Sequence, residues 1–373
     1  CHFTVWMGDA GASYLTGLNT RLKKDFGEEY QAKIITFIGA SYGEDKWLIK
    51  NKFAKDARGS LTVTVLRDGD FNIVVMKSQL MGWPVNYQDG TFDLNKVNFY
   101  PAPNDDYLEA AKLYASGQKV TLKLIKDGKF TGKDTTLACT GVSTWFPGDL
   151  NAVVEKGGLF NLASTKDFPS QMAGAVVFIN KWAVDNKEQV DNLVAAIGLG
   201  GDQVKSHKEA LEYAAKAGKD VFQSTMTEED IVKAYSSYDI TDDDGNIVNI
   251  GGSRVFNLAD AVNYGGVNGQ DKYKTVYNTF GNIVVEAYPE IMSAFVSYEE
   301  ATDYSYLRSA FNKYRDKAGN ISKVDFKDAT KTNQVIGDAS YSIEFNTGSD
   351  VIKPSSYHIL DKILAQLNIA DNS

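Results

Sequence analysis

A serine between two glycines is the first group in this sequence that could do chemistry. Residues 39–43 read G-A-S-Y-G, a G-x-S-x-G pattern centred on Ser41. The preceding run, KIITFI, predicts a buried strand, and the following run predicts a helix carrying Trp47, Leu48 and Phe53. Between a strand and a helix, this pattern marks the nucleophile of an α/β-hydrolase. The same turn could instead bind a ligand without cleaving it.

A serine nucleophile needs a histidine base, and the chain contains three histidines. His2 precedes the serine, His207 lies in the first turn of a predicted helix, and His358 lies in the last segment of the chain. None stands where an α/β-hydrolase carries its base, after the acid and at the carboxyl end of the sheet. A serine hydrolase that uses Ser41 is therefore the third-ranked hypothesis.

The ligand-binding interpretation uses the backbone of the turn. A Gly- and Ser-rich turn that opens a helix directs free N–H groups and the positive end of the helix dipole at a ligand, and both favour an anion. The residues predicted to contribute from this turn are Gly39, Ala40, Ser41 and Tyr42.

A similar turn follows the first predicted strand, FTVWM. It contains Asp9, Gly11, Ala12 and Ser13, and leucines at helical spacing follow it. Open α/β sheets bind ligands beyond the carboxyl ends of their strands, so the two turns together predict one binding site. Taken singly, each is also explained as a tight turn with a helix cap. Asp9 repels an oxyanion unless it is protonated or paired, so a zwitterion, an amine or a neutral ligand stays open.

Two further residues are candidate ligand contacts. Trp145, in GVSTWFPGDLNAV, either lines a cleft or packs in a core, and Gln171 either reaches the ligand or is an ordinary loop residue. The segment DITDDDGN invites a calcium interpretation. However, Gly245 as the sixth loop position of an EF-hand would place Ile240 where the loop needs Asp, so a hairpin turn is preferred. No metal site and no cofactor is predicted.

Composition excludes several classes of function. The 373 residues are 43% hydrophobic and 23% charged, which is typical of a globular chain of two or three domains. A net charge of -9 without basic clusters argues against nucleic-acid binding, so the predicted partner is a small molecule. The sequence contains no apolar run of about 18 residues, so no transmembrane helix is predicted.

The two cysteines, Cys1 and Cys139, leave three interpretations open. The printed chain begins at Cys1, as a mature or trimmed chain would. A disulfide between the two ranks first, because it suits an oxidising compartment and because CHFTVWMG enters a strand at once. The alternatives are a lipid-bearing Cys1, as in bacterial lipoproteins, and two unlinked thiols.

Strand-like and helix-like segments alternate in the first third of the chain, which predicts βαβ units and a mostly parallel sheet. The segment LTVTVLRDGDFNIVVM fits either a hairpin or two strands with different roles. The predicted domains are a first lobe (1–103 and 237–315), a second lobe (104–236), a polar linker (316–340), and a strand and helix too small to bury a core of their own (341–373).

Two segments, GDAGASYLTGLNTRLKKDFGEEY and IITFIGASYGEDKW, resemble the opening of periplasmic solute-binding proteins of ABC importers with the type II fold, especially the phosphate-binding branch. GVSTWFPGDLNAV and GAVVFINKWAVDNKEQVDNLVAAI are similar to second-lobe segments of nitrate- and sulfonate-type binding proteins. The resemblance implies a two-lobed α/β fold, a small ligand in a cleft that closes about a hinge, a periplasmic location, and an ABC permease or another envelope protein as partner.

The segment IEFNTGSDVIKPSSYHILDKILAQL, residues 343–367, resembles the first strand and helix of OmpA-like peptidoglycan-binding domains. The wall-binding Asp and Arg of that family come later in the pattern. Peptidoglycan binding is therefore expected only through residues beyond Ser373. The leading hypothesis is a non-enzymatic solute-binding protein of the bacterial envelope, tied to the cell wall through this unit. The alternative is an envelope structural or assembly protein that uses the same fold without a ligand.

Overall fold

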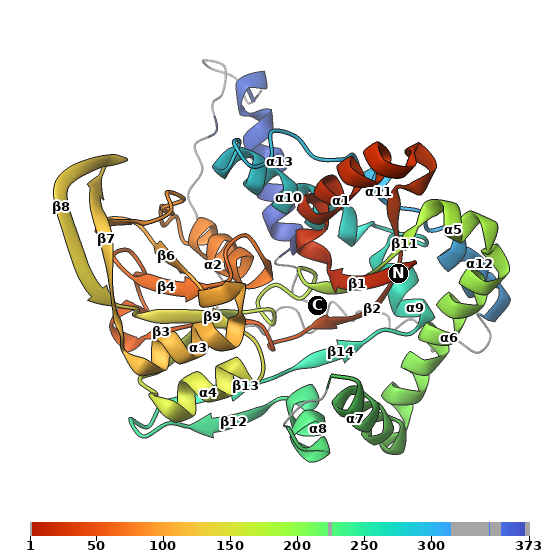
Figure 1. Ribbon diagram of the computed structural model, residues 1–373, viewed down its shortest axis with the longest axis horizontal. Helices are drawn as coiled ribbons and strands as arrows, with labels where there is room; N and C mark the ends of the chain where they lie inside the picture. Colours follow the sequence, from red (N-terminus) through yellow and green to blue (C-terminus); the bar gives the residue numbers. More distant parts are fainter. Residues whose placement is uncertain (1, 223–225, 315–342, 344–351, 370–373) are drawn as a thin grey trace.

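The computed structural model describes residues 2–222, 226–314, 343 and 352–369, and shows two main sheets flanked by helices, together with smaller sheets of three and two strands (Figure 1). The strands are β1 (Phe3–Met7), β2 (Ala32–Ser41), β3 (Lys46–Lys50), β4 (Leu61–Thr64), β5 (Thr91–Asp93), β6 (Asn98–Pro101), β7 (Lys119–Lys126), β8 (Lys129–Ala138), β9 (Gly141–Thr144), β10 (Leu159–Ser164), β11 (Ala173–Ile179), β12 (Tyr238–Thr241), β13 (Ile247–Ile250) and β14 (Ser253–Val255). The helices are α1 (Gly11–Phe26), α2 (Gly69–Leu80), α3 (Tyr107–Ser116), α4 (Gly148–Glu155), α5 (Asn180–Asp185), α6 (Lys187–Ser206), α7 (Lys208–Phe222), α8 (Glu228–Ser236), α9 (Leu258–Tyr264), α10 (Lys272–Ala287), α11 (Tyr298–Ala301), α12 (Ser305–Tyr314) and α13 (Tyr357–Ile369).

Each lobe is built on one of these sheets. Sheet 1 has the strand order β1-β11-β2-β14, and sheet 2 has the order β10-β3-β9-β4-β6. In sheet 1 every neighbouring pair is antiparallel, whereas in sheet 2 β9, β4 and β6 run parallel and β3 runs against them. The mostly parallel sheet predicted from the sequence is therefore wrong for sheet 1, because β11 returns from the other lobe between β1 and β2.

The chain passes from sheet 1 to sheet 2 and back at short connections. It leaves sheet 1 at residues 42–45, returns at 165–172, leaves again after α8 and returns between β13 and β14. The passage after α8 lies near the lobe boundary predicted at residue 236. None of these passages lies near the boundary predicted at residue 103. The β12–β13 hairpin, predicted in place of a calcium loop, is confirmed by its ladder from Tyr238 to Ile250.

Helix α2 is the element that was not predicted from the sequence. Every residue from Gly69 to Ser78 is buried, because the helix packs against β3, β9 and β10 of sheet 2 and against the turn that follows β1. A helix that is buried on every face shows no single apolar stripe at a 3.6-residue period, and its run Ile73-Val74-Val75 is typical of strands. Neither interpretation of 61–76 is therefore correct, since β4 is followed by a helix capped by Asp68.

Helix α13 corresponds to the helix of the OmpA-like resemblance, and it packs along α10 (Figure 1). The strand expected before it lies outside the described residues, apart from Ile343. Cys139, the expected disulfide partner of Cys1, is a free thiol that is 2% exposed in the core of lobe 2. Burial raises the pKa of this thiol to about 12. Cys1 lies outside the described residues.

Substitutions in α2 test whether both of its faces are buried. Val74→Ala and Val75→Ala should each lower the free energy of unfolding by about 2 kcal/mol, because each removes two buried methyl groups and leaves a cavity. Val154→Ala, in α4, removes the same atoms from a side chain that is 67% exposed and should change stability by less than about 0.5 kcal/mol. Chemical denaturation measures all three. A tolerated Val74→Ala or Val75→Ala would show that one face of α2 meets solvent.

Candidate functional site

A cavity of about 390 Å³ lies where the two lobes meet. Its walls come from the ends of β1, β2, β11 and β14, from the two connections into β3 and α2, and from the segment after β9. The lining residues are Met7, Ile38, Gly39, Ala40, Ser41, Glu44, Asp45, Asp68, Gly69, Asp70, Trp145, Met172, Gly174, Tyr235, Ser253, Arg254 and Val255. Apolar side chains thus share the cavity with four carboxylates and one guanidinium.

The Ser41 turn lines this cavity, but it does not open a helix. Strand β2 continues to Ser41, and the predicted helix beginning near Trp47 is wrong because residues 46–50 form β3. The N–H of Ser41 donates to Met172 O at 2.9 Å, and the N–H groups of Tyr42 and Glu44 both donate to Gly252 O. These N–H groups are used within the protein, so the turn does not present them to an anion.

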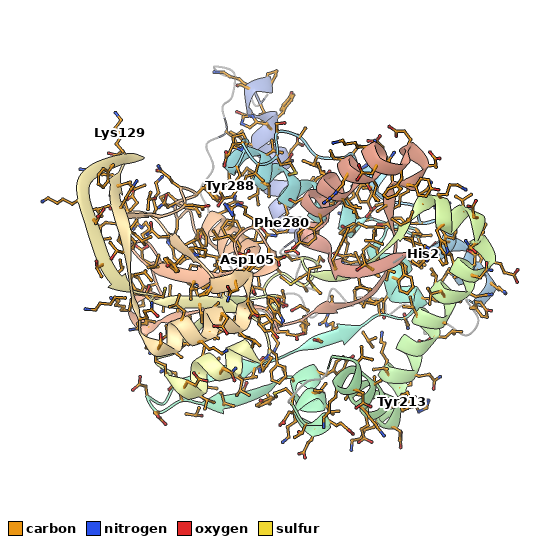
Figure 2. The ribbon with its side chains drawn as sticks, in the orientation of Figure 1. His2, Asp105, Lys129, Tyr213, Phe280 and Tyr288 are labelled. Carbon is orange, nitrogen blue, oxygen red and sulfur yellow. The ribbon has the colours of Figure 1, made fainter. Side chains whose placement is uncertain are left out.

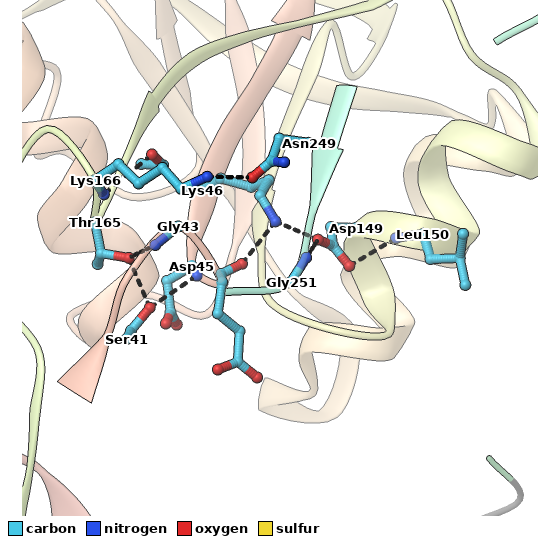
Figure 3. A network of polar contacts seen from close by, with 12 residues as sticks. Ser41, Gly43, Asp45, Lys46, Asp149, Leu150, Thr165, Lys166, Asn249 and Gly251 are labelled. Carbon is cyan, nitrogen blue, oxygen red and sulfur yellow. Dashed lines mark hydrogen bonds and ion pairs between the residues drawn. The ribbon is translucent and has the colours of Figure 1, made fainter. Parts of the chain in front are cut away.

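The hydroxyl of Ser41 is engaged as well. Its Oγ lies 2.6 Å from Thr165 Oγ1 and accepts from the N–H of Asp45 at 3.1 Å (Figure 3). All three histidines belong to the described part of the chain, and none of them lines the cavity. His2 stacks on Trp182 with 5.1 Å between the ring centroids, at the far edge of lobe 1 (Figure 2). Ser41 thus has no histidine base beside it.

The turn after β1 does open a helix, as predicted, but it faces the core. Gly11 packs against the Tyr273 hydroxyl, where a Cβ would overlap the oxygen, and that hydroxyl donates to Gly8 O at 2.9 Å. Ala12 is buried in the main core cluster, and Ser13 is half-buried. None of these residues belongs to the cavity lining.

Asp9 and Gln171, predicted from separate segments, meet behind the cavity wall. Gln171 Nε2 and Asn72 Nδ2 each donate to Asp9 Oδ2 at 3.1 Å, while Asp9 Oδ1 has no hydrogen-bond partner. Asp9 is 1% exposed and lies beside Gly69 at the start of α2. Burial raises the pKa of Asp9 to about 6, and the two amides counteract the rise only in part.

Of the two remaining predicted residues, one lines the cavity and the other does not. Trp145 lines the cavity, and its ring stacks on Tyr107 with 3.7 Å between the centroids, which fixes its orientation. Tyr42 is not part of the lining; its ring supports Arg254, whose guanidinium carbon lies 3.2 Å from the ring centroid. Arg254 is exposed, and it is the one cation among the lining residues.

The sequence analysis did not identify the acids of the cavity. Asp70 is 1% exposed, and neither of its carboxylate oxygens has a hydrogen-bond partner. Burial and the nearby carboxylates of Asp45 and Asp68 raise the pKa of Asp70 well above its ordinary value. Burial and Glu44 do the same to the pKa of Asp45. The signal for Asp68 and Asp70 was present, since an Asp before an apolar run is also an N-cap signature.

Lys46 counteracts the raised pKa values of Asp45 and Asp70 only in part, because its ammonium is bound to another carboxylate. Its ammonium pairs with Asp149 of α4 and donates to Glu44 O at 2.9 Å (Figure 3). Asp149 also accepts from the N–H of Gly251 at 3.1 Å and of Leu150 at 2.7 Å. Both charged side chains of the pair are fully buried. The pair therefore connects β3, α4 and the connection that returns to sheet 1.

The described residues contain no group of three or more His, Cys, Asp or Glu side chains arranged to hold a metal ion. Among those residues, no helix is long and apolar enough to cross a membrane.

The comparisons with known proteins bear on the fold. No protein-family model matches the chain, and no curated protein matches its sequence. The periplasmic nitrate-binding protein NrtA of Synechocystis PCC 6803 is similar in structure, with a TM-score of 0.50 and 11% identity over 83% of this chain and 75% of its own. The chain shares the two-lobed fold of that protein. The predicted type II α/β fold is confirmed.

Two other solved structures are similar at lower scores. The periplasmic aliphatic sulphonate binding protein SsuA of Escherichia coli has a TM-score of 0.47 and 9% identity over 91% of this chain and 85% of its own. The desulfurization enzyme DSZB has a TM-score of 0.40 and 10% identity over 84% of this chain and 87% of its own.

Breaking the buried pair should destabilise the protein strongly. Asp149→Asn leaves Lys46 charged and buried without its partner, so the free energy of unfolding should fall by about 3–5 kcal/mol. Asp185→Asn breaks the exposed Lys181–Asp185 pair and should cost less than about 1 kcal/mol. Urea denaturation of the two variants makes the comparison. Equal, small losses would mean that the buried Lys46–Asp149 pair contributes no more to stability than an exposed pair.

Asp9→Asn should stabilise the protein at neutral pH. A carboxyl with a pKa of about 6 when folded and 3.8 when exposed destabilises the fold increasingly as pH rises through that interval. The amide keeps an accepting oxygen for Asn72 and Gln171 without the charge. The free energy of unfolding should rise by up to about 3 kcal/mol at pH 7.5 and by only about 1 kcal/mol at pH 4.5. A gain independent of pH, or a loss at pH 7.5, contradicts this account of Asp9.

Proposed function

We propose that this chain is a non-enzymatic binding protein that holds a small solute in the cavity between its lobes. The observation that carries the proposal is the cavity itself, about 390 Å³ in volume, with walls from sheet 1 and from segments that flank sheet 2, and with a buried carboxylate, Asp70, that has no hydrogen-bond partner. Pockets of this kind, mostly apolar with a few convergent polar groups, are typical of small-molecule sites.

The engagement of Ser41 supports binding rather than hydrolysis. Its Oγ contacts Thr165 and the N–H of Asp45, and no histidine lines the cavity, so the groups of a Ser-His-Asp triad do not meet here.

Short connections support a hinge. The passages at residues 42–45 and 165–172 and the Gly251-Gly252 link join the sheets beside the cavity, and both glycines have positive φ, 67° and 114°. Closure of two domains around a ligand is a common motion of two-lobed binding proteins. We also propose, from the sequence resemblances, a periplasmic location, delivery of the solute to an ABC permease and a tie to the cell wall through the segment that includes α13.

A thermal-shift screen tests the proposal. The probes are nitrate, phosphate, methanesulfonate, amino acids, alkyl and aryl amines, and the corresponding alcohols. At least one should raise the unfolding temperature in a concentration-dependent way, because a ligand that binds only the folded state stabilises it. Val255→Trp fills the cavity from β14 and should abolish the shift.

The matched control is Val154→Trp, which adds the same ring at an exposed position of α4 and should keep the shift. If no probe stabilises the protein, the envelope structural or assembly role replaces solute binding. A shift that survives Val255→Trp would place the binding site elsewhere.

A further inference from the structure

The charge of the cavity restricts what it can bind. Four carboxylates line it, those of Glu44, Asp45, Asp68 and Asp70, against the single guanidinium of Arg254. Arg254 lies at the rim, exposed and stacked on Tyr42, whereas Asp45 and Asp70 are buried. The buried part of the site is therefore acidic. An oxyanion placed there would face carboxylates without the N–H groups that would compensate them, since the Ser41 turn uses its own.

Asp70 is a buried acid of the cavity wall whose carboxylate has no hydrogen-bond partner in the protein. A carboxylate removed from water without a counter-ion or hydrogen bonds is costly, and proteins normally pair or neutralise it. The neighbours that could serve are already committed: Lys46 pairs with Asp149, and Ser143 Oγ donates to the backbone oxygen of Asp70 rather than to its carboxylate. Both carboxylate oxygens therefore have no hydrogen-bond partner, and they lie buried in the wall of the cavity.

The rest of the lining indicates the shape of the partner. Met7, Ile38 and Val255 add apolar surface to the wall of the cavity, and Trp145, held by its stack on Tyr107, adds an aromatic ring. Aromatic faces and carboxylates both attract organic ammonium groups. A metal ion does not fit as well, because the acids of the described residues do not form a coordination group of three or more.

We propose that the cavity recognises a small organic molecule by its protonated amino group, which binds the Asp70 carboxylate beside Asp45 while the apolar part of the molecule packs against Trp145 and Val255. This inference rests on the proposed binding function and names the class of solute. A plain amine and a zwitterionic amino acid share this group. In the zwitterion, the carboxylate would lie toward Arg254.

Matched probe sets separate charge from shape. Each set contains one amine, the alcohol and the carboxylate of the same carbon skeleton, and the related amino acid: for example 2-phenylethylamine, 2-phenylethanol, 3-phenylpropionate and phenylalanine. Butyl and isobutyl sets extend the range of sizes. Thermal shift identifies the compounds that bind, and isothermal titration calorimetry gives their affinities. Only members with an ammonium group should bind, and amines and amino acids are compared directly.

Asp70→Asn supplies the decisive variant. It keeps the shape of the side chain but removes the charge, so the affinity for the ammonium compound should fall by about 10- to 100-fold. The ligand-free protein should become more stable, because a buried unpaired carboxylate is gone, and this shows that the variant is folded. Asp243→Asn, an exposed acid in the β12–β13 turn, should leave the affinity unchanged.

The outcomes are distinct. Binding of oxyanions without binding of any ammonium compound overturns this inference and leaves the proposed function intact. Equal binding of an amine and its alcohol, or an unchanged affinity in Asp70→Asn, also overturns it. If no probe binds, the proposed function fails and the inference fails with it.

Discussion

The buried ion pair between Lys46 and Asp149 is the interaction on which both the shape and the charge of this molecule depend. It joins the first residue of β3 to α4 and, through Gly251, to the connection that returns to sheet 1. Lys46 lowers the pKa values of Glu44, Asp45 and Asp70 only in part, because its ammonium is buried against Asp149. No lysine is among the described residues that line the cavity, so its four acids share the wall with Arg254 alone as a cation.

The turn at residues 39–43 has a different structural role from the one that its sequence predicts. From the sequence, residues 39–43 offered either a nucleophile or a set of free N–H groups. In the structure, Met172, Thr165 and Gly252 satisfy the turn, and all three come from segments more than a hundred residues away. The turn forms part of the cavity wall and helps to connect the lobes. In the function that we propose, side chains recognise the ligand, chiefly those at the start of α2.

Local pattern was sufficient for some elements and not for others. Strand β1 and the turn into α1 follow from an apolar run and helical spacing, and both were predicted. The segment 46–50 was predicted to be helical, but Trp47 and Leu48 fit a buried strand equally well, and the segment forms β3. Helix α2 was missed because complete burial erases its period. Of the candidate site, Trp145 and residues 39–41 reach the cavity. Asp70 could not be ranked, because its lack of partners depends on where Lys46 and Ser143 lie in space.

The chain shares its fold with a nitrate-binding protein, and the acids in its cavity are the basis of our proposal that it binds an ammonium compound. A crystal structure of the protein with an ammonium compound that stabilises it tests this claim most directly. We predict the ligand nitrogen at about 2.7–3.0 Å from the Asp70 carboxylate, with the carbon skeleton against Trp145. A ligand whose acidic group occupies the cavity while Asp70 remains without contact would contradict the account.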